Sequence, residues 1–328
     1  MLNTFCIVGD PHVTPKSLDK ADKLFDKIEQ IGLPTIILGD VLDTKEVVRG
    51  SCLNLVYNRL KSSKLQFIII VGNHDLFRLD QPHHSLEVLK ELPNVKIIDK
   101  VEQHPKLPFI FFPYIHDKAA LKDLLKSTSD ANLVAFGHFD VSGFDYGNGH
   151  LCEDGIITHE DFSGFKRVIS GHFHKLQQTG NFTYLGTPFS HSFGEANQDK
   201  VLGVYHVDQD KLELIPTEFP RHISVKVDMS KRGALKKIQD FIQGQENNLI
   251  RIQLHGSPED VVQLDKSQFP GLNIKWEDKS DSPVDSNVSL DESLDNKTQF
   301  QEWAKNIKNL DQDTIALGLS ILEGINAK

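Results

Sequence analysis

Cysteine is scarce in this chain and long apolar runs are missing, and both features narrow the class of protein. Only three of the 328 residues are cysteine (Cys6, Cys52 and Cys152), too few and too scattered for a disulfide framework, which predicts a reducing compartment. No stretch approaches the roughly 18 apolar residues of a membrane-spanning helix. The opening residues, MLNTFCIVGD, contain no basic segment, so no signal peptide is expected. We therefore expect a cytoplasmic protein without a membrane partner.

Basic residues are also in the minority. The chain has 36 lysines and arginines against 46 aspartates and glutamates, which gives a formal net charge of −10. Proteins that bind duplex DNA alone are usually basic, because neutralisation of phosphates dominates their affinity. The charge therefore argues against tight DNA binding by this chain on its own. It does not exclude metal-dependent chemistry on phosphate, since bound cations or a basic partner would offset it.

Short apolar runs alternate with amphipathic stretches over the first two-thirds of the sequence. The runs that predict buried strands are TFCIVGD (4–10), TIILGD (35–40), FIIIVGNHD (67–75), LVAFGH (133–138) and RVISGHFH (167–174). The stretches that predict helices are 18–31, 51–60, 85–92 and 118–125. This alternation indicates a layered α/β domain. After residue 180, NFTYLG, KVLGVYHV and KLELIPTEF predict consecutive antiparallel strands.

The last third has a different pattern. From about His222, the runs ISVKVDM, LIRIQLHG and LNIKWED, with helices near 231–242 and 259–264 between them, predict a small βαβαβ unit. Residues 279–297 hold almost no apolar side chains and indicate a flexible linker. Apolar residues return after it and predict short helices. The expected parts are 1–220, 221–278, 279–297 and 298–328.

All five strands of the first two-thirds end in glycine next to residues that bind metals. The motifs are GDPH, GDVLD, GNHD, GHF and GHFH. In α/β sheets, ligands bind outside the carboxyl ends of the strands, where loops from several strands converge. Each motif alone is compatible with a hydrogen-bonded turn, but five in succession predict a dinuclear metal site. The candidate residues are Asp10, His12, Asp40, Asn73, His74, Asp75, His138, His172 and His174.

The order of these motifs resembles the calcineurin-like metallophosphoesterase superfamily over about residues 4–206. The segments GHFHK, TYLGTPFSHSFGE and DKVLGVYHVD are similar to DNA double-strand-break repair nucleases of the SbcD type. FGHFDVSGFDYG most resembles the bacteriophage recombination endonuclease subunits of that family. The resemblance implies a four-layer α-β-β-α sandwich with a small α+β capping domain at 221–278. It further implies a C-terminal helical tail at 298–328 that docks on an ATPase.

The resemblance also distributes the ligands between two cations. It implies that Asp10, His12 and His174 hold one, that Asn73, His138 and His172 hold the other, and that Asp40 bridges them. Two adjacent cations can stabilise both the attacking and the leaving oxygen of an in-line displacement at phosphorus, so no serine or cysteine nucleophile is needed. A mixed nitrogen and oxygen ligand set suits Mn²⁺, Fe²⁺ or Zn²⁺ better than Ca²⁺. The family favours manganese.

Two residues of GNHD remain without a metal in this scheme. We expect His74 to contact the scissile phosphate and to act as the general acid for the leaving oxygen. Asp75 is expected to orient the His74 ring and raise its pKa, a role compatible with bracing the loop. For Asp43 the sequence leaves two roles open, support of Asp40 or a helix cap. For His191 a loop role is favoured over substrate contact.

The leading interpretation is a manganese-dependent DNA nuclease subunit of a repair and recombination complex. The resemblance implies 3′-to-5′ exonuclease and structure-directed endonuclease activity together with an SMC-like ATPase of the SbcC type. It also implies a homodimer of nuclease subunits within a heterotetramer, acting in the host cytoplasm if phage-encoded. A metal-dependent phosphatase or cyclic-nucleotide phosphodiesterase is the alternative, although it leaves 222–278 and the tail unexplained. A non-catalytic scaffold is disfavoured because every ligand position is filled.

Overall fold

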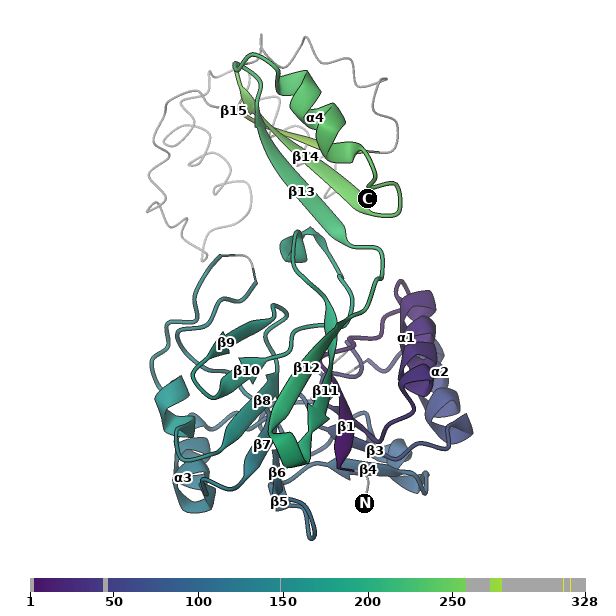
Figure 1. Cartoon of the computed structure of the whole chain (residues 1–328), viewed down its shortest axis with the longest axis vertical. Coiled ribbons are helices and arrows are strands. Elements are labelled where there is room, and N and C mark those ends of the chain that lie inside the picture. The colour runs from purple at the N-terminus through teal and green to yellow at the C-terminus, as the bar shows by residue number, and fades with distance from the viewer. Residues whose placement is uncertain are drawn as a thin grey trace.

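Two facing sheets with helices on their outer sides form the body of the protein (Figure 1). The computed structural model describes residues 3–43, 47–147, 149–257 and 272–278, together with positions 315 and 319. Helices α1 and α2 pack on the first sheet and α3 packs on the second. The predicted four-layer α-β-β-α sandwich is confirmed.

The first sheet has the strand order β12-β11-β1-β2-β3-β4. Its parallel strands are β1 (Thr4–Val8), β2 (Thr35–Ile37), β3 (Phe67–Ile70) and β4 (Val95–Ile98), and its antiparallel additions are β11 (Val201–His206) and β12 (Lys211–Pro216). The helices on its outer face are α1 (Leu18–Ile31) and α2 (Gly50–Ser62). Helix α1 turns the apolar stripe Ala21, Leu24, Phe25 and Ile28 to the sheet, as the helical spacing predicted.

The second sheet has the strand order β5-β6-β7-β8-β10-β9. Its strands are β5 (Glu102–Gln103), β6 (Phe109–Phe112), β7 (Val134–His138), β8 (Arg167–Gly171), β9 (Gln177–Thr179) and β10 (Phe182–Tyr184). Helix α3 (Lys118–Thr128) covers its outer face, and the Asp117 carboxylate accepts hydrogen bonds from the first-turn amides of Ala119 and Ala120. The short 3₁₀ helices are η1 (Glu87–Glu91), η2 (His159–Phe162), η3 (Phe193–Glu195) and η4 (Val207–Gln209).

Side chains between the two sheets form a dry core. Phe5 and Ile7 from β1 meet Phe109 and Phe111 from β6, all four buried, while Ile110 and its neighbours on the other face of β6 pack under α3. Because both faces of these strands are covered, they are apolar at every position except Thr4 rather than alternating. This packing fixes the ends of the strands and therefore the loops that follow them.

Several predictions about individual elements are wrong. The helix predicted at 85–92 is present only as the short 3₁₀ helix η1 (Glu87–Glu91). The NFTYLG segment contains β10, which pairs in parallel with β8 and lies in the other sheet from β11. The antiparallel pairing of β11 with β12 is confirmed. Strands β4, β5, β6 and β9 were not predicted at all.

A third, smaller sheet lies beyond one end of the sandwich (Figure 1). Its parallel strands are β13 (His222–Asp228), β14 (Leu249–Gly256) and β15 (Asn273–Asp278), covered by α4 (Ala234–Ile242). These strands and this helix match the prediction. The helix predicted near 259–264, the linker 279–297 and the tail 298–328 lie outside the described residues, apart from positions 315 and 319. The assignment of 221–278 as a capping domain stays a prediction.

The third sheet contacts the sandwich through the loop that precedes β11. The Asn197 side chain bonds both the carbonyl and the amide of Ser224 in β13, at 2.8 and 3.0 Å. Ser190 Oγ lies 2.7 Å from His222 Nδ1. The small sheet is thus bonded to the same loop, residues 190–197, that reaches into the candidate site below.

The helices and the cysteines bear on two further predictions, those about membranes and disulfides. None of the described helices is long and apolar enough to cross a bilayer. All three cysteines are buried and unpaired, and burial raises the pKa of the Cys6 thiol to about 12.

Candidate metal centre

The five motif loops meet at the carboxyl ends of strands from both sheets. Loops after β1, β2 and β3 of the first sheet face those after β7 and β8 of the second. All seven predicted ligands come together there: Asp10, His12, Asp40, Asn73, His138, His172 and His174. Asp10, Asp40 and His138 are almost completely buried. Residues from five separate loops, up to 164 positions apart, thus share one buried cluster.

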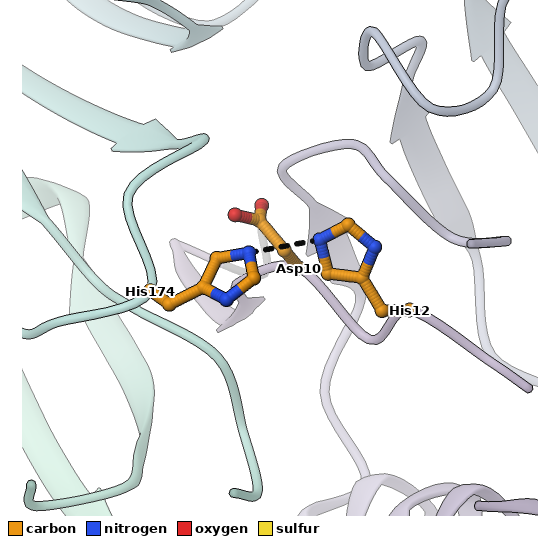
Figure 2. Close-up of side chains that lie close together, drawn as sticks. All are labelled: Asp10, His12 and His174. Atoms are coloured by element: carbon orange, nitrogen blue, oxygen red, sulfur yellow. Dashed lines mark hydrogen bonds between the residues drawn. The ribbon is translucent and has the colours of Figure 1, made fainter. Parts of the chain in front are cut away.

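The first group consists of Asp10, His12 and His174. The Nε2 atoms of the two histidines lie 3.0 Å apart, and Figure 2 shows the two rings facing each other beside the Asp10 carboxylate. Asp10 Oδ2 accepts a 2.7 Å hydrogen bond from the His172 amide, whereas Oδ1 is buried without a hydrogen-bond partner in the described chain. A ligand atom from each residue lies within 4.8 Å of the other two.

The second group is centred on Asn73. Its Oδ1 lies 2.9 Å from His138 Nε2 and 2.9 Å from His172 Nδ1. Asp40 Oδ2 lies 3.3 Å from His138 Nε2 and 3.5 Å from His12 Nε2, between the two groups. Asp40 therefore lies near histidines of both groups.

The donor set fits divalent cations. His138 Nδ1 donates to the Leu38 carbonyl and His174 Nδ1 donates to the Glu195 carboxylate, both at 2.9 Å, because those oxygens only accept. In the neutral rings, Nε2 then carries a lone pair that points into the cluster. Nitrogen ligands about 2.1 Å from one ion lie roughly 3.0–3.4 Å apart. The spacing of the donor atoms here is that of ligands around shared ions.

The pKa shifts in and beside the cluster also fit a site for cations. Burial raises the pKa of Asp75 to about 7, and the charge of Asp40 adds to the shift. Burial disfavours the charged form of His138, but the charges of Asp40 and Asp10 outweigh it and raise its pKa to about 9. In the free protein, histidine protons supply positive charge beside the buried carboxylates. Bound cations would supply that charge instead and release the protons.

Glycines of the motifs make room for the ligands. A Cβ on Gly72 would lie 2.2 Å from Asp40 Oδ1, and one on Gly171 would lie 2.2 Å from Asp10 Oδ1. Three residues of the cluster also adopt left-handed backbone conformations, His12 at φ +40°, Asp40 at +47° and His172 at +93°. Such strain is costly for residues with side chains and concentrates at functional sites. The motif glycines therefore allow the backbone to pack closely against the ligands as well as to turn.

His74 lies beside the first group, but with a different carboxylate from the one predicted. Its Nδ1 is 3.5 Å from Asp43 Oδ1, which also lies 3.3 Å from His12 Nδ1. The predicted role of Asp75 in orienting the His74 ring stays a prediction. Both Asp75 oxygens accept hydrogen bonds from backbone amides, those of Val41, Leu42 and Gly72, so this carboxylate braces two motif loops.

Asp43 is thus a site residue whose role the sequence left open. Its position three residues after Asp40 in GDVLD was the available signal. His12, Asp43 and His74 also have ligand atoms within 4.8 Å of one another, so metal binding by His74 is geometrically possible and needs an experimental test.

A buried ion pair behind His174 escaped the sequence analysis. Glu195 Oε1 accepts from His174 Nδ1, and Glu195 Oε2 lies 2.6 Å from Lys200 Nζ. Lys200 is 4% exposed and its Nζ also donates to Thr187 Oγ1 and to the His174 carbonyl. The Lys200 charge and the His174 hydrogen bond outweigh burial and hold the pKa of Glu195 below its usual range. The pair fixes the His174 ring with Nε2 toward the cluster.

Changing Glu195 to glutamine is expected to lower both stability and metal affinity. It leaves the Lys200 ammonium buried without its counter-charge, which costs about 3 kcal/mol of unfolding free energy. Metal affinity should fall by about 10- to 100-fold as His174 loses its charged partner. Urea unfolding and metal titration measure the two effects. Adding Lys200→Met should restore the unfolding free energy but not the metal affinity. An unchanged unfolding free energy and metal affinity in Glu195→Gln would contradict the supporting role of the Glu195–Lys200 pair.

Comparisons with known proteins identify the family. The family model described as "Calcineurin-like phosphoesterase" matches residues 4–176, more than half of the sequence. Among curated proteins, "Exonuclease subunit 1" of Enterobacteria phage T4 is 25% identical over 232 residues, which cover 66% of this chain and 68% of that protein. A solved crystal structure aligns with 66% of this chain and all of its own, with 12% identity and a TM-score of 0.47.

Proposed function

The chain belongs to the calcineurin-like phosphoesterase family of metal-dependent hydrolases, and we propose that within it the chain hydrolyses phosphodiester bonds of DNA. The similarity to the phage T4 protein named an exonuclease subunit supports a nuclease. We further propose that it serves DNA repair and recombination, with 3′-to-5′ exonuclease and structure-directed endonuclease activity. The word "subunit" in that name supports action within a complex.

The observation that carries the proposal is the convergence of seven donor residues at ligand spacing. Asp10, His12 and His174 would hold one cation, and Asn73, His138 and His172 the other, with Asp40 facing both. When bound, two divalent cations polarise the phosphoryl group and lower the pKa of water, which makes hydrolysis feasible near neutral pH. The donors mix imidazole nitrogens with carboxylate and amide oxygens, which suits Mn²⁺, Fe²⁺ or Zn²⁺. Among these we propose manganese, which the resemblance to the nuclease family favours.

The remaining residues supply proton transfer and positioning. Asp43 lies on the Nδ1 side of the His74 ring, so we assign proton donation to the leaving oxygen to Nε2. The His74 amide donates a 2.8 Å hydrogen bond to Asp40 Oδ1, which ties this loop to the bridging carboxylate. Asp75 holds the loop after β2 against the loop after β3 through three backbone amides. His74 is therefore the catalytic residue of this scheme, and Asp43 and Asp75 are positioning residues.

We propose an SMC-like ATPase of the SbcC type as the partner, docked on residues 298–328. The net charge of −10 supports a chain that needs another subunit to hold DNA. A homodimer of nuclease subunits within a heterotetramer completes this proposal, with the host cytoplasm as its compartment.

Substrate comparison tests the proposed function. The purified chain is loaded with Mn²⁺ and incubated with linear DNA, with bis(p-nitrophenyl) phosphate, and with phosphomonoesters and cyclic nucleotides, in the presence and absence of an SbcC-type ATPase. DNA should be degraded, and EDTA should abolish the reaction until Mn²⁺ is restored. Hydrolysis of phosphomonoesters or cyclic nucleotides without DNA cleavage under either condition would favour a phosphatase or cyclic-nucleotide phosphodiesterase instead.

A further inference from the structure

A cavity of about 260 Å³ opens beside the first metal group. Its walls come from the loop after β1, the first turn of α1 and the loop after β10. Lys16, Ser17, Lys20 and His191 line it together with His12 and His174, which are also candidate metal ligands. Whatever occupies this cavity therefore lies next to the proposed reaction centre.

The cavity carries positive charge in an acidic protein. Lys16 is exposed and Lys20 is half-buried, and neither has a carboxylate within ion-pair distance among the residues that the structure describes. Lys20 Nζ donates a 3.0 Å hydrogen bond to the Ser190 carbonyl, which holds the ammonium group at the cavity wall. Asp43, the carboxylate on the described lining, lies between the His12 and His74 rings. Within the described part of the chain, two lysine charges at this cavity thus have no carboxylate within ion-pair distance.

His191 adds a buried polar atom that lacks a partner. Its Nε2 is shielded from solvent and has no hydrogen-bond partner in the described chain. Its ring lies edge-on to the His12 ring, with centroids 5.6 Å apart, and packs against Phe189 at 4.9 Å. Buried polar atoms are nearly always paired, so the Nε2 of this lining residue has hydrogen-bonding capacity that a ligand could use.

Backbone amides at the start of α1 add to the same environment. The Ser17 hydroxyl accepts a 2.9 Å hydrogen bond from the Thr14 amide and makes no capping bond to the first turn of the helix. The amides of that turn therefore keep their donor capacity beside Lys16 and Lys20, and the helix dipole favours an anion there. These amides add to the anion-binding capacity of the two lysines and His191 but would not make an anion site alone.

We propose that the cavity is a subsite for a phosphate that does not react, the one next to the scissile phosphate on a nucleic-acid strand. Lys16 and Lys20 would bind it by charge-assisted hydrogen bonds, and His191 would bind it through Nε2. The inference rests on the proposed nuclease function and deepens it. It makes the substrate a strand with consecutive phosphates rather than an isolated diester or a phosphomonoester.

Two short substrates separate this subsite from the reaction centre. The dinucleotide d(TpT) has only a scissile phosphate, whereas d(TpTpT) offers a second one. With the Mn²⁺-loaded full chain, kcat/KM should be about tenfold higher for d(TpTpT), the gain expected from a charge-assisted contact. In the variant Lys16→Gln/Lys20→Gln, the ratio should fall to about two, the statistical value for two cleavable bonds. Lys23→Gln, an exposed lysine of α1 outside the cavity lining, is the matched control and should keep the tenfold ratio.

Binding without turnover gives a second readout. The affinity of the metal-free chain for a labelled oligothymidylate is measured in EDTA at several salt concentrations. The slope of log affinity against log salt concentration should be shallower in the double variant than in the wild type, by about 0.7 for each phosphate contact removed. The subsite is refuted if the double variant keeps the tenfold kcat/KM ratio or the salt slope of the wild type. It is also refuted if the wild type itself shows a kcat/KM ratio of only about two. A wild type that hydrolyses bis(p-nitrophenyl) phosphate but neither oligonucleotide refutes the nuclease function itself, and the subsite with it.

Discussion

The variant Asp40→Asn is expected to bind at most one cation and to lose about a thousandfold in kcat on DNA. Asp40 Oδ2 faces His12 on one side and His138 on the other, at 3.5 and 3.3 Å. In the proposed site, its negative charge is what allows two divalent cations to lie close together. An amide at the same place retains the shape but not the charge, so mutual repulsion should expel one ion.

Asparagine is chosen because it keeps the bond that holds the loop. Asp40 Oδ1 accepts the His74 amide at 2.8 Å, and an asparagine carbonyl oxygen can accept the same bond. The backbone of residue 40 is left-handed at φ +47°, a conformation that asparagine tolerates as well as aspartate does. The variant should therefore fold, and its defect should be electrostatic.

Metal content and thermal stability measure the effect. Mn²⁺ at about 100 times its dissociation constant stabilises a one-site protein by about 2.7 kcal/mol, and the wild type should show such a shift for each ion. Asp40→Asn should lose most of this Mn²⁺-dependent stabilisation. Elemental analysis should find at most half of the wild-type metal content in it. Asp123→Asn, on the exposed side of α3, removes the same charge outside the cluster and should behave as the wild type. Two tightly bound ions in Asp40→Asn would contradict the bridging role.

The strands that carry the ligands could be predicted because they are buried on both faces and end in glycine. Strand β6 has the same apolar character, FIFF, but it lies between Pro108 and Pro113 and ends without a metal-ligand residue. The pairing of β10 failed for a different reason. Sequence order suggested β11 as its neighbour, yet the 16 residues between them, 185–200, exceed a hairpin turn and cross to the other sheet.

The candidate ligands could be predicted because one rule, the convergence of loops at strand ends, applies to all of them. The supporting residues follow no such rule. Glu195 lies 21 positions from His174 and Lys200 lies 26 positions from it, on a loop whose path the sequence does not determine. Asp75 was assigned to His74 because the two are adjacent in the chain. Asp43, 31 positions from His74, comes within 3.5 Å of its ring through space, and the sequence alone left its role open.

Replacing His74 with serine is expected to lower kcat on DNA by about 10²- to 10⁴-fold while the protein still binds two cations. The reason is that the ring lies beside the ligand groups rather than within either of them, with its Nδ1 3.5 Å from Asp43. The backbone amide that bonds Asp40 is kept in the variant. Elemental analysis decides the metal question. A loss of one ion would show that His74 is a ligand of the His12–Asp43–His74 group instead.

The leaving group identifies the role of His74 as a general acid. A deoxyribose alkoxide is strongly basic and needs a proton as it departs, whereas p-nitrophenolate is a weak base and needs little help. His74→Ser should therefore be much less impaired on bis(p-nitrophenyl) phosphate than on DNA. Asp43→Asn should show a smaller loss with the same preference, and the double variant should be no worse than His74→Ser, because Asp43 acts through the ring. Equal losses on both substrates would place His74 in phosphate binding rather than in proton transfer.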